Sequence, residues 1–400
     1  MCYNFSVMKF SRRAFVGLGL AAASGACAEG PGTFFDPQKG TANVVSDAPA
    51  AAGAVTRTVA FLGGSITEMH GYRPRVMEML RKRYPGVAFK EIAAGLSSTC
   101  SDAAAFRFAE DVLAQGTPDL LFVEEAVNDD QDGHFDRRHM ILGLEGVIRQ
   151  AYQANPSCRI VVGLLPNHAQ FQQLAQGREP LAYRVHGEIA RHYGLAVADV
   201  TAALVKSAAS GGFGWGQYRD CHPSPDGCDF AAKVIFAAIC DGYDPAARPQ
   251  PRPVPAPMEA ASLVHPGTVA PAQVALGADW RHTAPDWAKV PGSKRGYFTI
   301  GPAYWTETAT SELTVNFTGT ALAAFLTAGP DCGDLVVAVD GGTPRTLRLR
   351  ADYGSLHYPY VQFLAEGLQP GAHRAVLKAQ SRPHGAVTGC AIRLHRLYFN

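Results

Sequence analysis

The sequence predicts two folded parts of different class: an α/β part built on a parallel sheet, followed by an all-β sandwich. Strand-like and helix-like segments alternate from 58 to 243, the proline-dense stretch DPAARPQPRPVPAPM spans 244–258, and short runs of alternating apolar and polar residues follow. Repeated β-α-β alternation indicates a parallel sheet covered by helices on both faces. Alternation with a period of two indicates half-buried strands of an antiparallel sheet.

The α/β part is expected to contain five strands, each rich in apolar residues and each followed by a helical segment. These strands are predicted at 58–62, 87–92, 119–125, 159–165 and 196–199. The helices are predicted near 73–83, 102–114, 137–154, 180–193 and 225–240. Because the carboxyl ends of parallel strands meet at one edge of the sheet, residues that follow the first three strands should gather there.

Residues 259–400 are predicted to form the all-β part, and 244–258 to form a stiff, extended linker before it. Leu313, Val315 and Phe317 alternate with polar residues, as in a half-buried strand. Two further runs flank Asp340-Gly341-Gly342, a pattern typical of a β-hairpin. We interpret this part as a β-sandwich, loosely similar to the jelly-roll modules that are attached to carbohydrate-active enzymes.

The first 28 residues are typical of an export signal. Ser11-Arg12-Arg13-Ala14-Phe15-Val16 resembles a twin-arginine motif, and the apolar stretch 15–26 that follows is too short to span a membrane. The small residues around Cys27 fit a cleavage site, and lipid attachment at Cys27 is the less favoured alternative because Ser24 stands where an apolar residue is usual. Residues 29–57 are expected to be a linker, and the protein is expected in the periplasm or outside the cell.

Composition excludes several classes of function. The net charge is +1, and no basic stripe with interleaved aromatic residues is present, so nucleic acid is not an expected partner. The sequence has no C-x-x-C pair, and neither a metal ion nor a cofactor is expected. Export would place the nine cysteines in an oxidising compartment. Cys221 with Cys228 and Cys332 with Cys390 are candidate disulfides, and buried free thiols are the alternative.

The strongest functional signal is a serine at the end of the first predicted strand, in Gly63-Gly64-Ser65-Ile66-Thr67. Glycines there allow a sharp turn and a close approach of substrate, so the Ser65 hydroxyl is a candidate nucleophile. Three later segments strengthen this interpretation. Gly95 follows the second predicted strand, Asn128 follows the third, and His222 lies in the segment DCHPS near the end of the α/β part.

Ser, Gly, Asn and His in this order resemble the four sequence blocks of the SGNH (GDSL-type) hydrolase family, over about residues 58–243. The resemblance implies a flavodoxin-like three-layer fold and hydrolysis of acyl esters. It also implies that Ser65 is the nucleophile, that His222 is its base, and that Asn128 and the backbone N–H groups of Ser65 and Gly95 bind the oxyanion. Two blocks depart from the family, with Gly64 where Asp is common and Ala126 where Gly is common. Neither change removes a reacting group.

The acid partner of His222 departs from the family pattern. Family members usually carry Asp three residues before the His, but Arg219 holds that position here and Asp220 stands two residues before. We expect Asp220 to orient His222 through a differently bent loop. The alternative is a Ser–His dyad in which a backbone carbonyl orients the imidazole.

Four residues near these blocks are candidates for substrate binding: Arg73, His168, Trp215 and Tyr218. Exposed aromatic rings in the glycine-rich loop before His222 would suit stacking on a sugar, and packing in the core is the alternative for them. Glu124 and Glu125 are adjacent and would point to opposite faces of a strand. They are therefore not interpreted as a glycosidase pair.

Together these features predict an exported serine esterase that removes acetyl groups from an O-acetylated polysaccharide or oligosaccharide. A lipase, a thioesterase or an O-acyltransferase on the same fold is the first alternative, because each would use the same serine and histidine. A non-catalytic glycan-binding protein is the alternative from another class, and the intact set of Ser, Gly, Asn and His argues against it.

Overall fold

The computed structural model describes residues 55–248, 250–294, 301–349, 353–384 and 387–400. The expected signal segment 1–28, with Cys27, and nearly all of the linker 29–57 lie outside the described residues.

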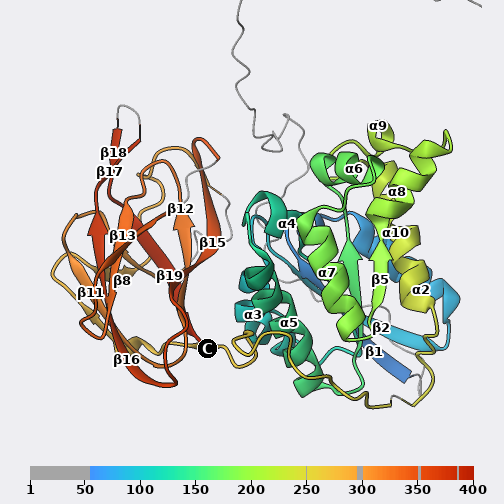
Figure 1. The fold of residues 1–400 in the computed structure, drawn as a ribbon, viewed down its shortest axis with the longest axis horizontal. Helices are drawn as coiled ribbons and strands as arrows, with labels where there is room; N and C mark the ends of the chain where they lie inside the picture. The colour runs from blue at the N-terminus through green and yellow to red at the C-terminus, as the bar shows by residue number, and fades with distance from the viewer. Residues whose placement is uncertain (1–54, 249, 295–300, 350–352, 385–386) are drawn as a thin grey trace, which may run out of the picture. The chain divides into compact units, whose positions relative to one another are not determined.

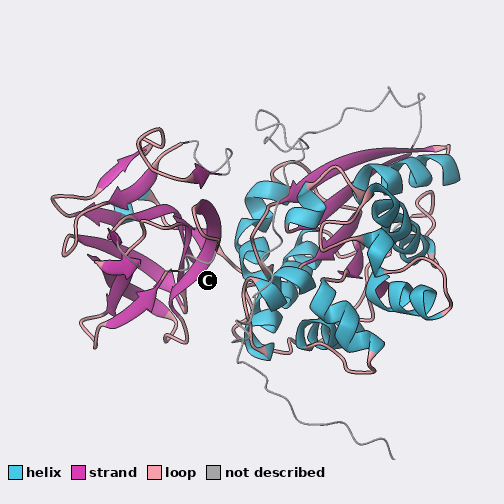
Figure 2. Ribbon diagram, turned by 90° about the horizontal axis from the view of Figure 1, so that it is seen from above, coloured by secondary structure: helices cyan, strands magenta, loops and turns pink. Residues whose placement is uncertain are grey.

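The first part is built on a five-stranded parallel sheet with helices on both faces (Figures 1 and 2). Its strands are β1 (Val55–Gly63), β2 (Val87–Gly95), β3 (Leu120–Glu124), β4 (Arg159–Leu164) and β5 (Ala196–Asp199). The order in the sheet is β2-β1-β3-β4-β5, and each neighbouring pair is parallel. This is the flavodoxin-like order, and the predicted fold class is confirmed. Every residue of β3 is buried, as expected for a central strand covered on both faces.

Helices connect these strands and follow the last one. They are α1 (Ser65–Glu68), α2 (Tyr72–Arg83), α3 (Ser101–Phe108) with a π-helical extension Ala109–Leu113, α4 (Ala126–Gln131), α5 (Arg137–Ala154), α6 (His168–Ala175), α7 (Leu181–His192), α8 (Val200–Ala209), α9 (Trp215–Tyr218) and α10 (Pro225–Cys240). The start of α5 is capped by the Asp136 side chain, which accepts the His139 backbone N–H, and the start of α10 by Ser224 ahead of Pro225. The sequence interpretation had no helix at α1, α4, α6, α8 or α9.

The second part consists mainly of two β-sheets that face each other. The larger sheet has the order β8 (Arg281–Thr283), β10 (Ala303–Thr306), β19 (Ile392–Phe399), β12 (Leu322–Ala328), β15 (Leu356–Ala365) and β9 (Ser293–Lys294), and β6 (Gly267–Thr268) pairs with β19. The second has the order β14 (Arg345–Arg348), β13 (Asp334–Val339), β16 (Gly371–Gln380), β11 (Glu312–Gly319) and β7 (Val274–Leu276). The short strands β17 (Arg382–His384) and β18 (Val387–Gly389) form a separate pair.

The core of this second part confirms the expected sandwich. Leu313, Val315 and Phe317 of β11 are buried against residues of β12, β15 and β19 in one hydrophobic cluster. β13 and β14 pair as the predicted hairpin, and Asp340 and Gly341 adopt positive φ in its turn (53° and 71°). Asp and Gly tolerate this conformation, which explains why the turn forms at Asp340-Gly341-Gly342.

The proline-rich segment 244–258 lies along the α/β part in an irregular, hydrogen-bonded course. Arg149 of α5 donates to the Pro255 carbonyl at 2.9 Å, and the fully buried Glu145 accepts the backbone N–H groups of Met258 and Glu259 at 2.6 and 3.0 Å. The chain therefore docks on α5 before it enters the sandwich.

Neither candidate disulfide is present, because Cys228, Cys332 and Cys390 take part in no disulfide, so the alternative of unbridged thiols holds for these three residues. The Cys228 and Cys390 thiols face backbone carbonyl oxygens, at 3.5 Å from Pro223 and 3.1 Å from Glu307. The Cys332 sulfur accepts a hydrogen bond from Arg382 at 3.1 Å. Proximity along the chain or a shared β-sheet domain does not align two Cβ atoms, which is what a disulfide requires.

Among the described residues, no helix combines the length and the apolar composition that crossing a bilayer would require.

Candidate active site

The carboxyl ends of β1, β2 and β3 meet in register. Gly63 pairs with Gly95 of β2 and with Glu124 of β3. Ser65, Gly95 and Asn128 therefore lie at one edge of the sheet, as the sequence predicts from the strand ends. Close packing at this edge requires glycine at Gly95, where an added Cβ would lie 2.2 Å from the backbone nitrogen of Glu68. β2 can thus approach α1 closely only at a residue without a side chain.

Ser65 is the first residue of α1, and its hydroxyl faces the imidazole of His222. The distance from His222 Nε2 to Ser65 Oγ is 2.7 Å. His222 lies on the loop between α9 and α10, which Ser224 fixes by donating to the Gln217 carbonyl at 2.6 Å and by capping α10. A hydroxyl within hydrogen-bond reach of a histidine nitrogen is the arrangement that allows the ring to take its proton.

Asn128 lies on α4, the short helix directly after β3, and is 2% exposed. Its Nδ2 donates to Asp132 Oδ2 at 2.6 Å, and Asp132 also accepts a hydrogen bond from Tyr353. An added Cβ on Gly64 would lie 2.2 Å from Asn128 Oδ1. The glycine that replaces the common family Asp at this position thus leaves space for the Asn128 amide beside Ser65.

A buried network fixes the start of α4. Asp129 accepts the backbone N–H and the hydroxyl of Ser101, both at 2.8 Å, and its Oδ2 lies 2.9 Å from His186 Nε2. Asp129, Ser101 and His186 are each fully buried. These contacts tie the helix that carries Asn128 to α3 and α7.

Asp220 contacts the backbone next to the histidine ring. Its Oδ1 accepts the backbone N–H of His222 at 2.7 Å. Donor atoms of Asp220, Cys221 and His222 lie within 4.8 Å of one another, the spacing of a possible metal site in the described part of the chain. Because His222 Nε2 faces Ser65, we interpret these three residues as the loop that positions the general base rather than as a metal site. Arg219, at the usual acid position, adopts φ 92°, so the loop bends sharply there.

The four candidate substrate-binding residues have different environments. His168 is exposed and stacks on the half-buried Trp215 ring, with ring centroids 5.0 Å apart. Tyr218 is fully buried, and burial raises the pKa of its hydroxyl, so the expectation of an exposed ring was wrong for this residue. Arg73 is 8% exposed, forms an ion pair with Glu91, and donates to the carbonyls of Thr67 and Glu68. Those contacts are typical of a residue that holds α1 in place.

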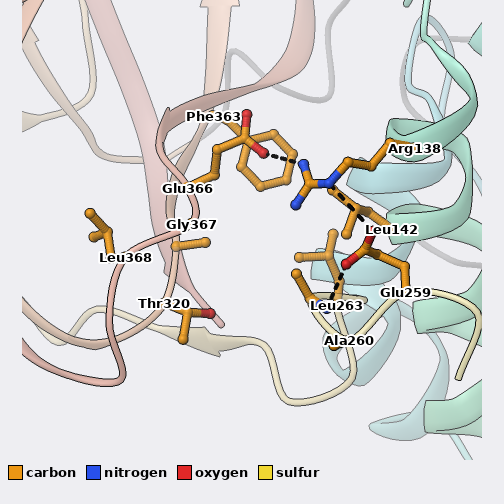
Figure 3. Close-up of a pocket in the computed structure, with 12 residues that line it drawn as sticks. Arg138, Leu142, Glu259, Ala260, Leu263, Thr320, Phe363, Glu366, Gly367 and Leu368 are labelled. Atoms are coloured by element: carbon orange, nitrogen blue, oxygen red, sulfur yellow. Dashed lines mark hydrogen bonds and ion pairs between the residues drawn. The ribbon is translucent and has the colours of Figure 1, made fainter.

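A hollow elsewhere in the molecule does not include these residues. It is lined by Arg138 and Leu142 of α5, by Glu259 and by residues near the end of β15 (Figure 3). Arg138 forms ion pairs there with Glu366 at 2.7 Å and Glu259 at 3.5 Å. Since no nucleophile and base lie together in it, this hollow is not the candidate active site.

Sequence reasoning missed Asp132 and His186, which lie around the site, and it considered Glu124 only as part of a glycosidase pair. Glu124 is 1% exposed, its Oε1 accepts a hydrogen bond from Thr67 at 2.8 Å, and burial raises the pKa of its carboxyl to about 8. Asp132 follows Asn128 by four residues, the spacing of neighbours on one helix face, and a predicted helix at α4 would have revealed it. His186 lies too far from Asp129 along the chain for any local pattern to connect them.

The fold matches known structures. A two-domain esterase (CEX) active on acetylated mannans aligns with TM-score 0.69 and 20% identity, over 86% of this chain and 91% of that chain. The same esterase co-crystallised with mannopentaose aligns with TM-score 0.68 and 19% identity, over the same shares. At this identity the likeness establishes a common two-domain fold. No curated protein matches the sequence.

The family is indicated by a match of its own. A model of the GDSL-like lipase/acylhydrolase family matches residues 61–230, the span that contains Ser65, Gly95, Asn128 and His222. The sequence of the four blocks, the flavodoxin-like sheet order and this match agree with one another. Residues 61–230 of this chain are therefore similar to the GDSL-like lipase/acylhydrolase family.

Proposed function

We propose that this protein is an exported serine esterase that releases acetate from an O-acetylated polysaccharide or oligosaccharide through an acyl-enzyme on Ser65. The observation that carries this proposal is the 2.7 Å contact between His222 Nε2 and Ser65 Oγ at the carboxyl edge of the parallel sheet. An ester hydrolase needs such a nucleophile and base beside donors for an oxyanion, and Gly95 and Asn128 lie at the same edge.

The reaction follows from these positions. Ser65 Oγ attacks the acetyl carbonyl carbon while His222 Nε2 takes the hydroxyl proton. The carbonyl oxygen becomes an oxyanion that accepts hydrogen bonds from the N–H groups of Ser65 and Gly95 and from the Asn128 amide. The C–O bond to the sugar breaks, and His222 returns the proton to the leaving sugar oxygen. A water molecule then attacks the acetyl-Ser65 ester with His222 again as base, which releases acetate and regenerates the serine.

Two features support a carbohydrate as the alcohol. The exposed His168 of α6 and the half-buried Trp215 of α9 form a stacked aromatic pair. The loop that carries His222 follows α9 directly. Flat aromatic surfaces of this kind suit the apolar faces of sugar rings. The esterase with the same two-domain fold acts on acetylated mannans, and we carry an acetylated polysaccharide over to this chain as the proposed substrate class.

Acetate release from a panel of substrates tests this proposal. The panel contains acetylated mannan, acetylated xylan and acetylated pectin, together with 4-nitrophenyl acetate, butyrate and octanoate. We expect acetate release from at least one polysaccharide and a rate on the acetate ester that exceeds the rates on longer chains. A preference for the octanoate ester would indicate a lipase-like enzyme. Binding of a polysaccharide without turnover of any ester would indicate a non-catalytic glycan-binding protein.

A further inference from the structure

A buried carboxyl group lies directly beneath the nucleophile turn. Glu124 ends β3 and pairs in register with Gly63 of β1. Its Oε1 accepts a hydrogen bond from Thr67 Oγ1 at 2.8 Å, and the backbone N–H of Gly64 donates to the same carboxyl. A Cβ on Gly63 would lie 2.9 Å from Oε1. The Glu124 carboxyl therefore contacts the turn on both sides of Ser65.

The surroundings of this carboxyl disfavour a negative charge. Thr67 of α1 and Tyr72 of α2 lie beside it with hydroxyl groups that contact each other at 2.7 Å. The fully buried Tyr218 of α9 is also close enough for the Glu124 charge to raise its pKa. The charged groups that face it from β3 and α4 are also acids, Glu125 and Asp129. A buried charge without a paired cation is strongly destabilising.

The two nearest buried arginines are engaged elsewhere. Arg107 of α3 donates to the Gly63 carbonyl at 3.0 Å and pairs with Asp111 at 2.8 Å, and its charge lowers the pKa of Glu125. Arg73 of α2 pairs with Glu91. Burial accordingly raises the pKa of Glu124 to about 8, despite the hydrogen bonds from Thr67 and Gly64 that lower it.

We propose that Glu124 is a positioning residue of the nucleophile turn, and that its carboxyl must be uncharged for Ser65 to act. The inference rests on the proposed esterase function. The uncharged carboxyl accepts hydrogen bonds from Gly64 and Thr67 and thereby fixes the backbone on both sides of Ser65. A carboxylate in the same place would be bound to the Gly64 N–H, one residue before the Ser65 N–H that is proposed to bind the oxyanion. Its negative charge would repel the negative charge that develops on the oxyanion.

The conservative variant Glu124→Gln tests this role, because glutamine keeps the shape and the acceptor oxygen but cannot ionise. We expect the kcat of the wild-type protein to fall about tenfold as pH rises past 8, because the Glu124 carboxylate that then forms would repel the oxyanion. Glu124→Gln should keep its kcat at pH 7 within about threefold of wild type and should lack this fall. Glu145→Gln, which removes a fully buried carboxyl of α5 that bonds residues 258–262, is the matched control and should retain this fall.

Thermal unfolding gives a second readout that needs no substrate. In the unfolded chain the Glu124 carboxyl ionises near pH 4.5, whereas in the folded protein it stays protonated up to about pH 8. Its contribution to the free energy of unfolding is therefore fully present below pH 4.5 and is lost as pH rises through 8. Because glutamine does not titrate, the Tm of Glu124→Gln should increase relative to wild type between pH 5 and pH 8.

Two results would overturn the inference. One is a Glu124→Gln enzyme whose kcat falls at alkaline pH as that of wild type does, or whose kcat at pH 7 drops more than about a hundredfold. The other is a Tm difference between Glu124→Gln and wild type that does not change from pH 5 to pH 8. A protein that hydrolyses no ester yet shows the growing Tm difference contradicts the proposed function and supports an uncharged Glu124.

Discussion

Fully buried carboxyl groups of the α/β part and a half-buried carboxyl group of the sandwich have opposite environments. At the edge of the parallel sheet, Glu124 Oε2 and both carboxyl oxygens of Glu125 lack a hydrogen-bond partner among the described contacts. In the sandwich, both oxygens of Asp331 bind Arg393, at 3.0 and 2.7 Å, and Oδ1 also lies 2.8 Å from His357 Nε2. The Trp287 ring covers the Arg393 guanidinium, 5.2 Å from the ring centroid.

The pKa values of these acids move in opposite directions for this reason. Burial raises the pKa of Glu124 to about 8, and it raises the pKa of Glu125 although the positive charge of Arg107 lowers it. Burial would also raise the pKa of Asp331, but hydrogen bonds and positive charge from His357 and Arg393 lower it well below its usual range. Paired charges of this kind stabilise a domain. Buried acids without a hydrogen-bond partner, at the end of a strand, are instead typical of a functional site. We therefore expect substitutions around Ser65 to affect catalysis and a substitution of Asp331 to affect stability.

The largest loss of activity is expected when the base is removed. His222→Ala should lower kcat by about four orders of magnitude or more, because Ser65 then has no group that takes its proton. His192→Ala, at an exposed position on α7, is the control and should leave kcat unchanged. An equal loss of activity in both variants, with both folded by circular dichroism, would contradict the role of His222 as the base.

Asn128→Ala should have the next largest effect. Loss of one oxyanion donor should lower kcat by about 10²–10³ with little change in KM. Steady-state kinetics on 4-nitrophenyl acetate measure both constants. A change in KM alone would mark Asn128 as a residue that binds the substrate in its ground state.

Asp220→Asn is expected to have an intermediate effect. Asp220 shapes the loop through the His222 backbone, and a carboxylate beside the imidazole stabilises the protonated ring. We expect kcat to fall by about ten- to a hundredfold. A loss as large as that of His222→Ala would indicate a full triad, and a nearly silent substitution would support a Ser–His dyad.

Asp331→Asn should have the smallest effect on activity and a clear effect on stability. It leaves the buried Arg393 without its carboxylate, which should lower the free energy of unfolding at pH 7 by about 3 kcal/mol. Because the pKa of Asp331 is lowered in the folded protein, its stabilising contribution is present above about pH 4 and is lost as pH falls below that. Denaturant unfolding at pH 7 and pH 3 measures the difference, which should shrink at pH 3. A fall in kcat as large as that of Asn128→Ala would contradict the purely structural role of Asp331.

The strand ends were predictable from the sequence, and the contacts beneath them were not. Ser65, Gly95 and Asn128 come together because parallel strands place their carboxyl ends at one edge, and strand patterns are local. The short helices α4 and α6 were missed because they begin within a few residues of a buried strand and show little periodicity of their own.

Long-range contacts account for the remaining errors. The lack of a disulfide at Cys228, Cys332 and Cys390 and the burial of Tyr218 depend on how distant segments pack. Glu124 was interpreted from strand geometry alone. That geometry shows that its side chain points away from that of Glu125, but it does not show which residues the side chain contacts. Its partners Thr67 and Gly64 lie about sixty residues earlier in the chain.

The role of Ser65 as the nucleophile is tested by the activity of Ser65→Ala on the acetylated polysaccharide that the wild-type protein deacetylates fastest. Acetate release is measured for both proteins at equal concentration, with circular dichroism to show that the variant is folded. We expect kcat to fall by about four orders of magnitude or more, because alanine has no hydroxyl with which to form the acyl-enzyme. Retention of more than about a tenth of the wild-type kcat would contradict the assignment of Ser65 as the nucleophile.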